Sequence, residues 1–161
     1  MLNSAPIIVN LFGSCRLQLY LCTRIRVCYC MKNKSQQSLE AAQKLISLRK
    51  PLGYNSSIHC SYYAVLQYMK YMLANTRNTP LSYEQQDISS QSSHEYLLTE
   101  ITNRFDSYNE KRDFTHLFRF LKKNRVEADY TTKDFSEFES LKCKENAEAA
   151  IKKIKRNLGD L

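Results

Sequence analysis

Apolar residues recur every three or four positions along most of the chain after residue 31, which is the spacing of amphipathic α-helices. The first such stretch covers residues 39–49 and is followed by Pro51-Leu52-Gly53. Because Pro and Gly interrupt helices, this tripeptide predicts the end of a first helix. The only other Pro and Gly residues after residue 31 are Pro80 and Gly159. The sequence therefore predicts that the following helices are long.

The second stretch carries the broadest apolar face. Asn55-Ser56-Ser57 precedes it, and short polar side chains of this kind favour the N-cap of a helix. Asn78-Thr79-Pro80 ends it. The breadth of the face predicts a central helix. The apolar members are Ile58, Tyr62, Val65, Leu66, Met69, Met72 and Leu73.

Three further helices are predicted after a polar connection over residues 81–91. Ser92-Ser93-His94-Glu95 places a glutamate three residues after a serine, the arrangement of a capping box, and predicts the start of a helix. A fourth helix is expected to end near residues 125–128. Asp134 and Glu137 are expected in the first turn of a long terminal helix, where the helix dipole favours negative charge.

This succession of helices predicts an all-α fold, a compact up-and-down bundle of four to five helices over residues 31–161. Isolated amphipathic helices are marginal in water, so they gain stability by packing their apolar faces together. Residues 1–30 have a different pattern, in which a short apolar run is followed by Arg16 and an alternating segment. We interpret residues 1–30 as a non-native leader or poorly ordered extension, with Met31 as the natural start. The alternative is a strand or helix that docks on the bundle.

The charge is moderately positive. The sequence has 24 Lys and Arg against 16 Asp and Glu, a net charge of +8. Residues 1–30 hold three of the arginines and no acidic residue, so the rest of the chain carries +5. This excess suggests an acidic partner such as RNA or DNA, and a solvated surface is the alternative. The 25% of charged residues excludes an integral membrane protein, so no membrane partner is expected.

The cysteines do not indicate a metal site. Four of the six lie in residues 1–30, and Cys60 and Cys143 are the two in the rest of the chain. Their spacing does not match the paired cysteines of zinc sites, so neither a metal nor another cofactor is predicted. Two scattered thiols favour the reducing environment of the cytoplasm.

Three segments carry a family resemblance, and they occur in the expected order. Residues 54–65, which include His59 and Tyr62-Tyr63-Ala64, look like the second helix of HEPN domains. Residues 93–98 resemble the start of the following helix. Residues 125–130 are similar to the Arg-x-x-Ala-Asp-Tyr signature of one HEPN branch. The resemblance covers residues 32–158 and implies a HEPN-like helical bundle.

The resemblance also implies a function. HEPN domains are often dimeric, and many are ribonucleases of toxin–antitoxin or defence systems, frequently beside a small nucleotidyltransferase partner. Others have lost catalysis and bind nucleotides or proteins. The nuclease members carry an Arg, four to six residues and then a His, whereas here the four residues after Arg125 lead to Tyr130. A phenol, with a reference pKa near ~10, is a poor base at neutral pH.

We therefore expect a non-catalytic or weakly active HEPN-like module that binds RNA, a nucleotide or a partner protein. The alternative is a metal-independent ribonuclease, a HEPN toxin, so whether the chain is an enzyme stays open. A homodimer is expected because the tyrosine-rich second helix offers more apolar surface than a small bundle covers. The tyrosines concerned are Tyr62, Tyr63, Tyr68 and Tyr71, which we interpret as core and interface rings, with base stacking as the alternative.

The predicted RNA- or phosphate-binding residues are Arg125, Asp129, Tyr130 and His59, and the catalytic candidates are Arg125, Tyr130 and His94. Arg125 offers a planar fork of donors to a phosphate. The alternative is structural, with Asp129 paired to Arg125 and Tyr130 packing its ring. For His59 the alternative is a packed, hydrogen-bonded histidine. For His94 it is a capping or interface residue whose pKa is lowered by the positive end of its helix.

His116 is the third histidine. It follows Arg112 with three intervening residues, which is one fewer than the nuclease spacing requires. Residues four apart share a helix face, so we interpret Arg112 and His116 as a solvated pair.

Overall fold

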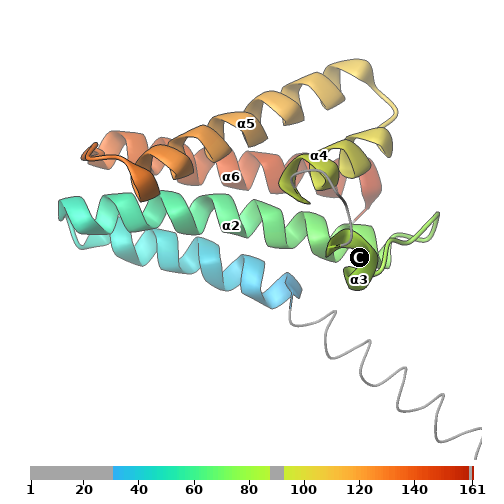
Figure 1. The fold of residues 1–161 in the computed structure, drawn as a ribbon, viewed down its shortest axis with the longest axis horizontal. Coiled ribbons are helices and arrows are strands. Elements are labelled where there is room, and N and C mark those ends of the chain that lie inside the picture. Colours follow the sequence, from blue (N-terminus) through green and yellow to red (C-terminus); the bar gives the residue numbers. More distant parts are fainter. Residues whose placement is uncertain (1–30, 88–92, 160) are drawn as a thin grey trace, which may run out of the picture.

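The computed structural model describes residues 31–87, 93–159 and 161, and within these ranges every regular element is a helix. The predicted all-α bundle is therefore confirmed (Figure 1). The described residues form one helix more than the upper estimate. The interpretation of residues 1–30 lies outside the described residues. Residues 31–47 are helical, and after them come α2 (Pro51–Asn75), α3 (Tyr83–Asp87), α4 (Ser93–Asn103), α5 (Tyr108–Tyr130) and α6 (Glu137–Leu158).

Helix α2 runs through the middle of the bundle, as its broad apolar face predicted (Figure 1). It packs against α4, α5 and α6. The helix formed by residues 31–47 lies along α2, where Ser35 Oγ donates to the carbonyl oxygen of Ala64 at 2.7 Å and Ser38 Oγ donates to Gln67 Oε1 at 3.0 Å. Most of the α2 surface is thus covered by other helices of the same chain.

The tyrosines of α2 do not form an uncovered surface. Tyr62, Tyr68 and Tyr71 are buried, and Tyr63 is half-buried. The premise of the homodimer argument, that α2 has more apolar surface than the bundle covers, is therefore wrong, because four helices of one chain cover it. A homodimer stays a prediction and requires a different surface.

Helix α2 begins at Pro51, earlier than the predicted cap at residues 55–57. Proline suits the first turn of a helix, where its missing N–H leaves no hydrogen bond unmade. Ser57 consequently lies inside α2, and its Oγ donates to the carbonyl oxygen of Tyr54 at 2.7 Å. Gly53 marks a close approach of two helices, because a Cβ at this position would lie 2.5 Å from the carbonyl oxygen of Leu45. Pro51 and Gly53 therefore follow the end of the first helix, as predicted, and they also lie in the first turn of α2.

Helix α3 occupies part of the segment predicted to be a polar connection. Gln86 is buried there, and its Nε2 donates to the carbonyl oxygens of Lys70 at 3.1 Å and Leu81 at 2.9 Å. These bonds hold α3 against the end of α2. Residues 88–92, which include the first serine of the predicted capping box, lie outside the described residues, and α4 begins at Ser93.

A capping box does occur at the start of α6. Ser136 is the N-cap, where its Oγ accepts from the N–H of Glu139 at 3.3 Å and its own N–H donates to Glu139 Oε2 at 2.9 Å. Glu137 lies in the first turn as predicted, whereas Asp134 precedes the helix. The capping box determines where α6 begins. The prediction that rested on the helix dipole alone placed the start of this helix too early, because it included Asp134.

The core of the bundle is apolar and aromatic. Phe105, in the turn after α4, packs its ring 5.4 Å from that of Phe114 on α5. Most of the other large core side chains come from α2, α4, α5 and α6. The outward faces are mainly polar and charged, although a few large apolar side chains such as Leu52 and Phe138 are exposed. In the part of the chain that the structure describes, no helix has both the length and the apolar content needed to cross a bilayer.

Candidate functional site

The structure brings four of the predicted site residues together where α2 packs against α5. His59 lies on α2, and Arg125, Asp129 and Tyr130 lie at the carboxyl end of α5. Arg125 and Asp129 are four residues apart and share a helix face. We call these four residues the α2–α5 cluster. His94, at the start of α4, lies close enough to Arg125 for this cation to contribute to lowering the pKa of His94.

Asp129 joins the two helices within the cluster. His59 Nδ1 lies 3.1 Å from both carboxylate oxygens of Asp129, and Arg125 Nε lies 2.7 Å from Asp129 Oδ2. The Arg125 Nε–H is not aimed at that oxygen and has no acceptor among the described residues, so the contact is an ion pair without a well-directed hydrogen bond. The predicted pair between Arg125 and Asp129 is present, and the contact with His59 is additional.

Two tyrosine rings hold the guanidinium of Arg125. Its Cζ lies 5.5 Å from the centroid of the Tyr63 ring and 5.4 Å from that of the Tyr130 ring, within the range of a cation–π interaction. An Nη atom also donates to Tyr63 Oη at 3.1 Å. Burial lowers the pKa of Arg125, but Tyr63, Asp129 and Tyr130 together outweigh it and leave the pKa above its ordinary value. Arg125 therefore stays cationic while its side chain is only 16% exposed.

His59 has one ring nitrogen, Nδ1, in contact with Asp129. A carboxylate only accepts hydrogen bonds, so the Nδ1 that faces Asp129 carries a proton. In the neutral ring the lone pair then lies on Nε2. The side chain of His59 is 46% exposed, and its ring lies 4.5 Å from that of Tyr63. His59 is hydrogen-bonded, as one reading of the sequence predicted, but it is not packed into the core.

His94 has the opposite arrangement. Tyr62 is fully buried, and its Oη lies 2.8 Å from His94 Nδ1. Burial raises the pKa of Tyr62, so the phenol keeps its proton, and Nδ1 is the acceptor that the described residues supply for it. Burial and then the neighbouring Lys122 and Arg125 lower the pKa of His94. Neutral His94 consequently carries its proton on Nε2, which makes that atom a donor.

The pKa of His94 is thus lowered as the sequence predicted, but for a different leading reason. The prediction attributed the shift to the positive end of a helix, whereas burial and nearby cations account for it in the structure. The burial of His94 and its nearby cations could not be predicted from residues 92–95 alone, because Tyr62, Lys122 and Arg125 belong to other helices.

The remaining candidates lie outside the cluster. Arg112 and His116 are exposed on the outer face of α5, as predicted, and Arg112 is paired with Asp113 at 3.5 Å. No group of three or more His, Cys, Asp or Glu side chains that could hold a metal occurs in the described parts of the chain.

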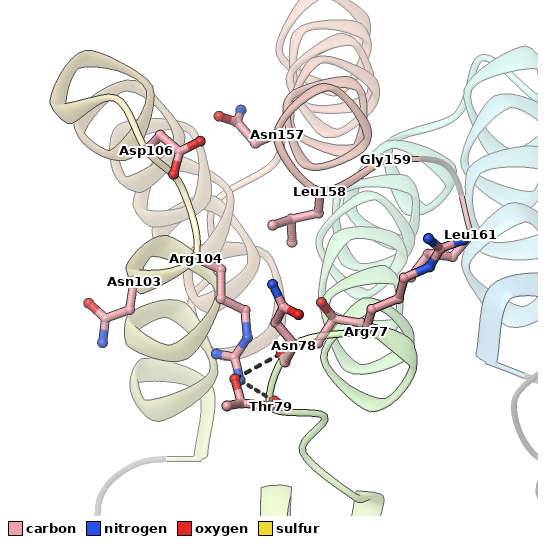
Figure 2. Close-up of a pocket in the computed structure, with 11 residues that line it drawn as sticks. Arg77, Asn78, Thr79, Asn103, Arg104, Asp106, Asn157, Leu158, Gly159 and Leu161 are labelled. Atoms are coloured by element: carbon pink, nitrogen blue, oxygen red, sulfur yellow. Dashed lines mark hydrogen bonds between the residues drawn. The ribbon is translucent and has the colours of Figure 1, made fainter.

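A pocket of about 680 Å³ lies at the far end of the bundle, where α2, α4 and α6 end. Figure 2 shows Arg104 reaching from the end of α4 to the loop after α2, where its Nη donates to the carbonyl oxygen of Thr79 at 2.9 Å. Arg104 also donates to the carbonyl oxygen of Glu100. Arginine is favourable at such a site because helix carboxyl ends carry unpaired carbonyls. The pocket contains none of the predicted site residues, so the α2–α5 cluster is the better candidate.

Comparison with known proteins gives one family match. The family model of the HEPN domain matches residues 30–158. The matched range contains α2 and α5 and therefore every residue of the cluster. Among curated proteins, no sequence matches the chain.

Proposed function

The chain belongs to the HEPN domain family, and from this premise we propose that it is an RNA-binding module of a toxin–antitoxin or defence-type system. In this proposal the α2–α5 cluster binds a phosphate of the RNA, and the module is non-catalytic or weakly active. Arg125 is the principal contact, and His59, Asp129 and Tyr130 surround it.

The observation that carries the proposal is the contact of the Arg125 guanidinium with two tyrosine rings, together with its hydrogen bond to Tyr63. Arginine has five N–H donors in one plane. The ion pair with Asp129 and the hydrogen bonds with Tyr63 and Tyr130 orient the group. The other donors suit a phosphate, which arginine binds with charge-assisted hydrogen bonds. Tyr130 is 73% exposed and offers a ring beside that phosphate.

Two of the catalytic candidates lack the chemistry of a base. Tyr130 offers a phenol, a type of group that is a poor base near neutral pH. The geometry at Tyr62 places a proton on His94 Nε2, so this atom supports a hydrogen bond to RNA and not proton removal. Binding is therefore the function that these side chains support best.

Metal-independent RNA cleavage is a second candidate function, favoured by the contact between His59 and Asp129. This contact leaves a lone pair on the exposed Nε2, which could take the proton of a ribose 2′-hydroxyl. The 2′-oxygen would then attack phosphorus, the bond to the 5′-oxygen would break, and the leaving oxygen would receive a proton from the imidazolium. Arg125 would stabilise the charge on the phosphate.

The family suggests two protein partners, a small nucleotidyltransferase and a second copy of the chain. Light scattering over a concentration series tests whether the chain forms a homodimer. Co-purification tests whether a small nucleotidyltransferase binds. We place the module in the cytoplasm, because Cys60 and Cys143 are both free thiols.

The proposed function is tested by measuring RNA binding of Arg125→Ala. We expect the change to weaken binding of a fluorescent single-stranded RNA by about 1.5–3 kcal/mol, roughly 10- to 150-fold in Kd, because a charge-assisted hydrogen bond is lost. Arg125→Lys should recover only part of the loss, since lysine has no planar fork. Fluorescence anisotropy at fixed salt gives the Kd values.

Arg77→Ala is the matched control. Arg77 is an exposed arginine at the far end of α2, so its removal changes the net charge equally without touching the cluster. Equal Kd values for the wild-type protein and Arg125→Ala would refute the proposal. A circular dichroism spectrum of each variant shows whether the helices are intact.

A further inference from the structure

The outer face of α5 carries a row of exposed side chains, of which only the last, Tyr130, also belongs to the α2–α5 cluster. Successive members are four, three, four, three and four residues apart, so they line one face of the helix. All of them are exposed. We call this row the α5 stripe. It comprises Arg112, His116, Arg119, Lys123, Val126 and Tyr130.

Three of the six members of the α5 stripe are cations. The side chains of Arg112, Arg119 and Lys123 are 54%, 63% and 77% exposed. No member of the stripe is acidic. An extended row of cations on one helix face is the electrostatic pattern of a surface that binds a phosphate backbone.

Each of the three cations has a carboxylate beside it, from outside the stripe. Ion pairs between exposed side chains are weak and are screened by salt, so a phosphate can replace these carboxylates at little cost. The pairs are Arg112 with Asp113 at 3.5 Å, Arg119 with Glu95 at 2.9 Å and Lys123 with Glu127 at 3.9 Å.

The α5 stripe leads directly to the α2–α5 cluster. Its last member, Tyr130, has its ring 5.4 Å from Arg125 Cζ and is 73% exposed. With a rise of 1.5 Å per residue, the path from Arg112 to Tyr130 is about 27 Å long. It is continuous along one helix, so a chain of phosphates bound there would reach Arg125 without crossing another element.

The chemistry of the stripe selects among possible partners. A second copy of α5 would bring like charges together, which is unfavourable. An exposed tyrosine ring at the end of a row of cations suits an unpaired base, because single-strand binders combine a basic track with aromatic rings on which bases stack. A duplex offers no free base to Tyr130.

We propose that the α5 stripe binds the phosphate backbone of single-stranded RNA and guides it to Arg125, and that one base stacks on Tyr130. This inference rests on the proposed function, since it names the form of the RNA and its path to the cluster. Arg112, Arg119 and Lys123 are positioning contacts, and Tyr130 is the stacking contact.

The test compares two triple variants by the salt dependence of binding to a single-stranded RNA. The stripe variant carries Arg112→Gln, Arg119→Gln and Lys123→Gln. A control variant carries Lys34→Gln, Lys44→Gln and Lys152→Gln, which removes the same charge from exposed positions on other helices. Single strands release about 0.7 counterions per phosphate contact, so we expect the stripe variant to make the slope of log K against log salt shallower by about 2. The control should keep the wild-type slope.

A second arm tests the base contact. Tyr130→Ala should weaken binding of the single strand by roughly tenfold, in line with the loss of one stacked base, and leave the affinity for a duplex of equal length unchanged. Equal losses for single strand and duplex would overturn the stacking contact.

The outcomes separate the inference from the proposed function. If Arg125→Ala weakens RNA binding while the stripe variant keeps both the Kd and the slope of the control, the inference fails and the proposed function stands. If the wild-type protein binds no RNA, both fail. Polyglutamate serves as the probe for an acidic protein partner. If the stripe variant loses binding of polyglutamate but still binds RNA as the wild-type protein does, the stripe is a surface for an acidic protein, and the inference is overturned.

Discussion

At the scale of single residues, two histidines near Arg125 differ in which nitrogen carries the proton. Asp129 places the proton of His59 on Nδ1, whereas the buried Tyr62 hydroxyl places that of His94 on Nε2. His59 therefore presents an acceptor to solvent, and His94 presents a donor. The difference arises from the hydrogen-bond partner of each ring and not from the position of either residue in its helix.

The lowered pKa of His94 predicts a loss of stability below neutral pH. As the pH falls below the ordinary histidine value of 6.5, the unfolded chain takes up a proton that the folded chain takes up only at lower pH. The free energy of unfolding then decreases, because the unfolded state binds more protons. We expect the wild-type Tm to fall between pH 7.5 and pH 5.5, and His94→Asn to remove part of this fall.

Thermal unfolding followed by circular dichroism provides the measurement, with His116→Asn as the control at an exposed position. Glu95, Glu110 and Glu139 also have lowered pKa values. These change the free energy of unfolding mainly below the ordinary glutamate value of 4.5, so they have little effect between pH 7.5 and pH 5.5. Parallel curves for the wild-type protein and His94→Asn would contradict the assignment.

The sequence predicted all four residues of the α2–α5 cluster, but it predicted only the contact between Arg125 and Asp129 and not that between His59 and Asp129. Arg125 and Asp129 pair because residues four apart share a helix face, which depends on local structure alone. The contact between His59 and Asp129 joins residues 70 positions apart, so it depends on how α2 and α5 are rotated against each other. Side-chain periodicity gives no such angle, and for that reason the exposed Nε2 of His59 was not predicted.

At the scale of elements, α5 has two separate surfaces. One face buries Phe114, Phe118 and Leu121 in the core, and the last turns of the same helix place Arg125 against α2. The opposite face is the α5 stripe. A single helix can therefore hold the cluster in place and lead a strand of RNA to it.

The start of α6 depends on its capping box, which gives a prediction about stability. Ser136→Ala removes the side chain that accepts from the Glu139 N–H, and loss of such an N-cap costs about 1 kcal/mol. We expect urea unfolding to show this loss with an unchanged m value. Ser47→Ala is the control, because Ser47 is exposed and bonds only to a carbonyl oxygen of its own helix. Equal midpoints for the two variants would contradict the role of the cap.

Long helices were predictable from the sequence, and short or capped features were not. The repeats that form α2, α5 and α6 extend over many turns, so their periodicity is unmistakable. Helix α3 has five residues, which is too few for a repeat. The N-terminus of α2 was misplaced because Pro51 and Gly53 are compatible with both the end of one helix and the beginning of the next.

At the scale of the whole molecule, the burial of α2 determines where function can lie. Helices on several sides cover its apolar face, so the accessible part of α2 is the edge that carries His59. The succession of amphipathic helices in the sequence predicted a bundle. It did not predict which helices are neighbours, because many arrangements of the helices bury the same apolar faces. The α2–α5 cluster exists because α5 packs beside that edge of α2.

The central claim is that this cluster binds RNA and leaves it intact, and one measurement tests it most directly. A 5′-labelled single-stranded RNA is incubated with the wild-type protein, with His59→Ala and with Arg125→Ala, and both complex formation and RNA length are read on gels from the same samples. We expect the wild-type protein to form a complex with full-length RNA, and Arg125→Ala to form much less of it. Cleavage by the wild-type protein that disappears in both variants would contradict the account, and it would assign His59 as the base of a metal-independent ribonuclease.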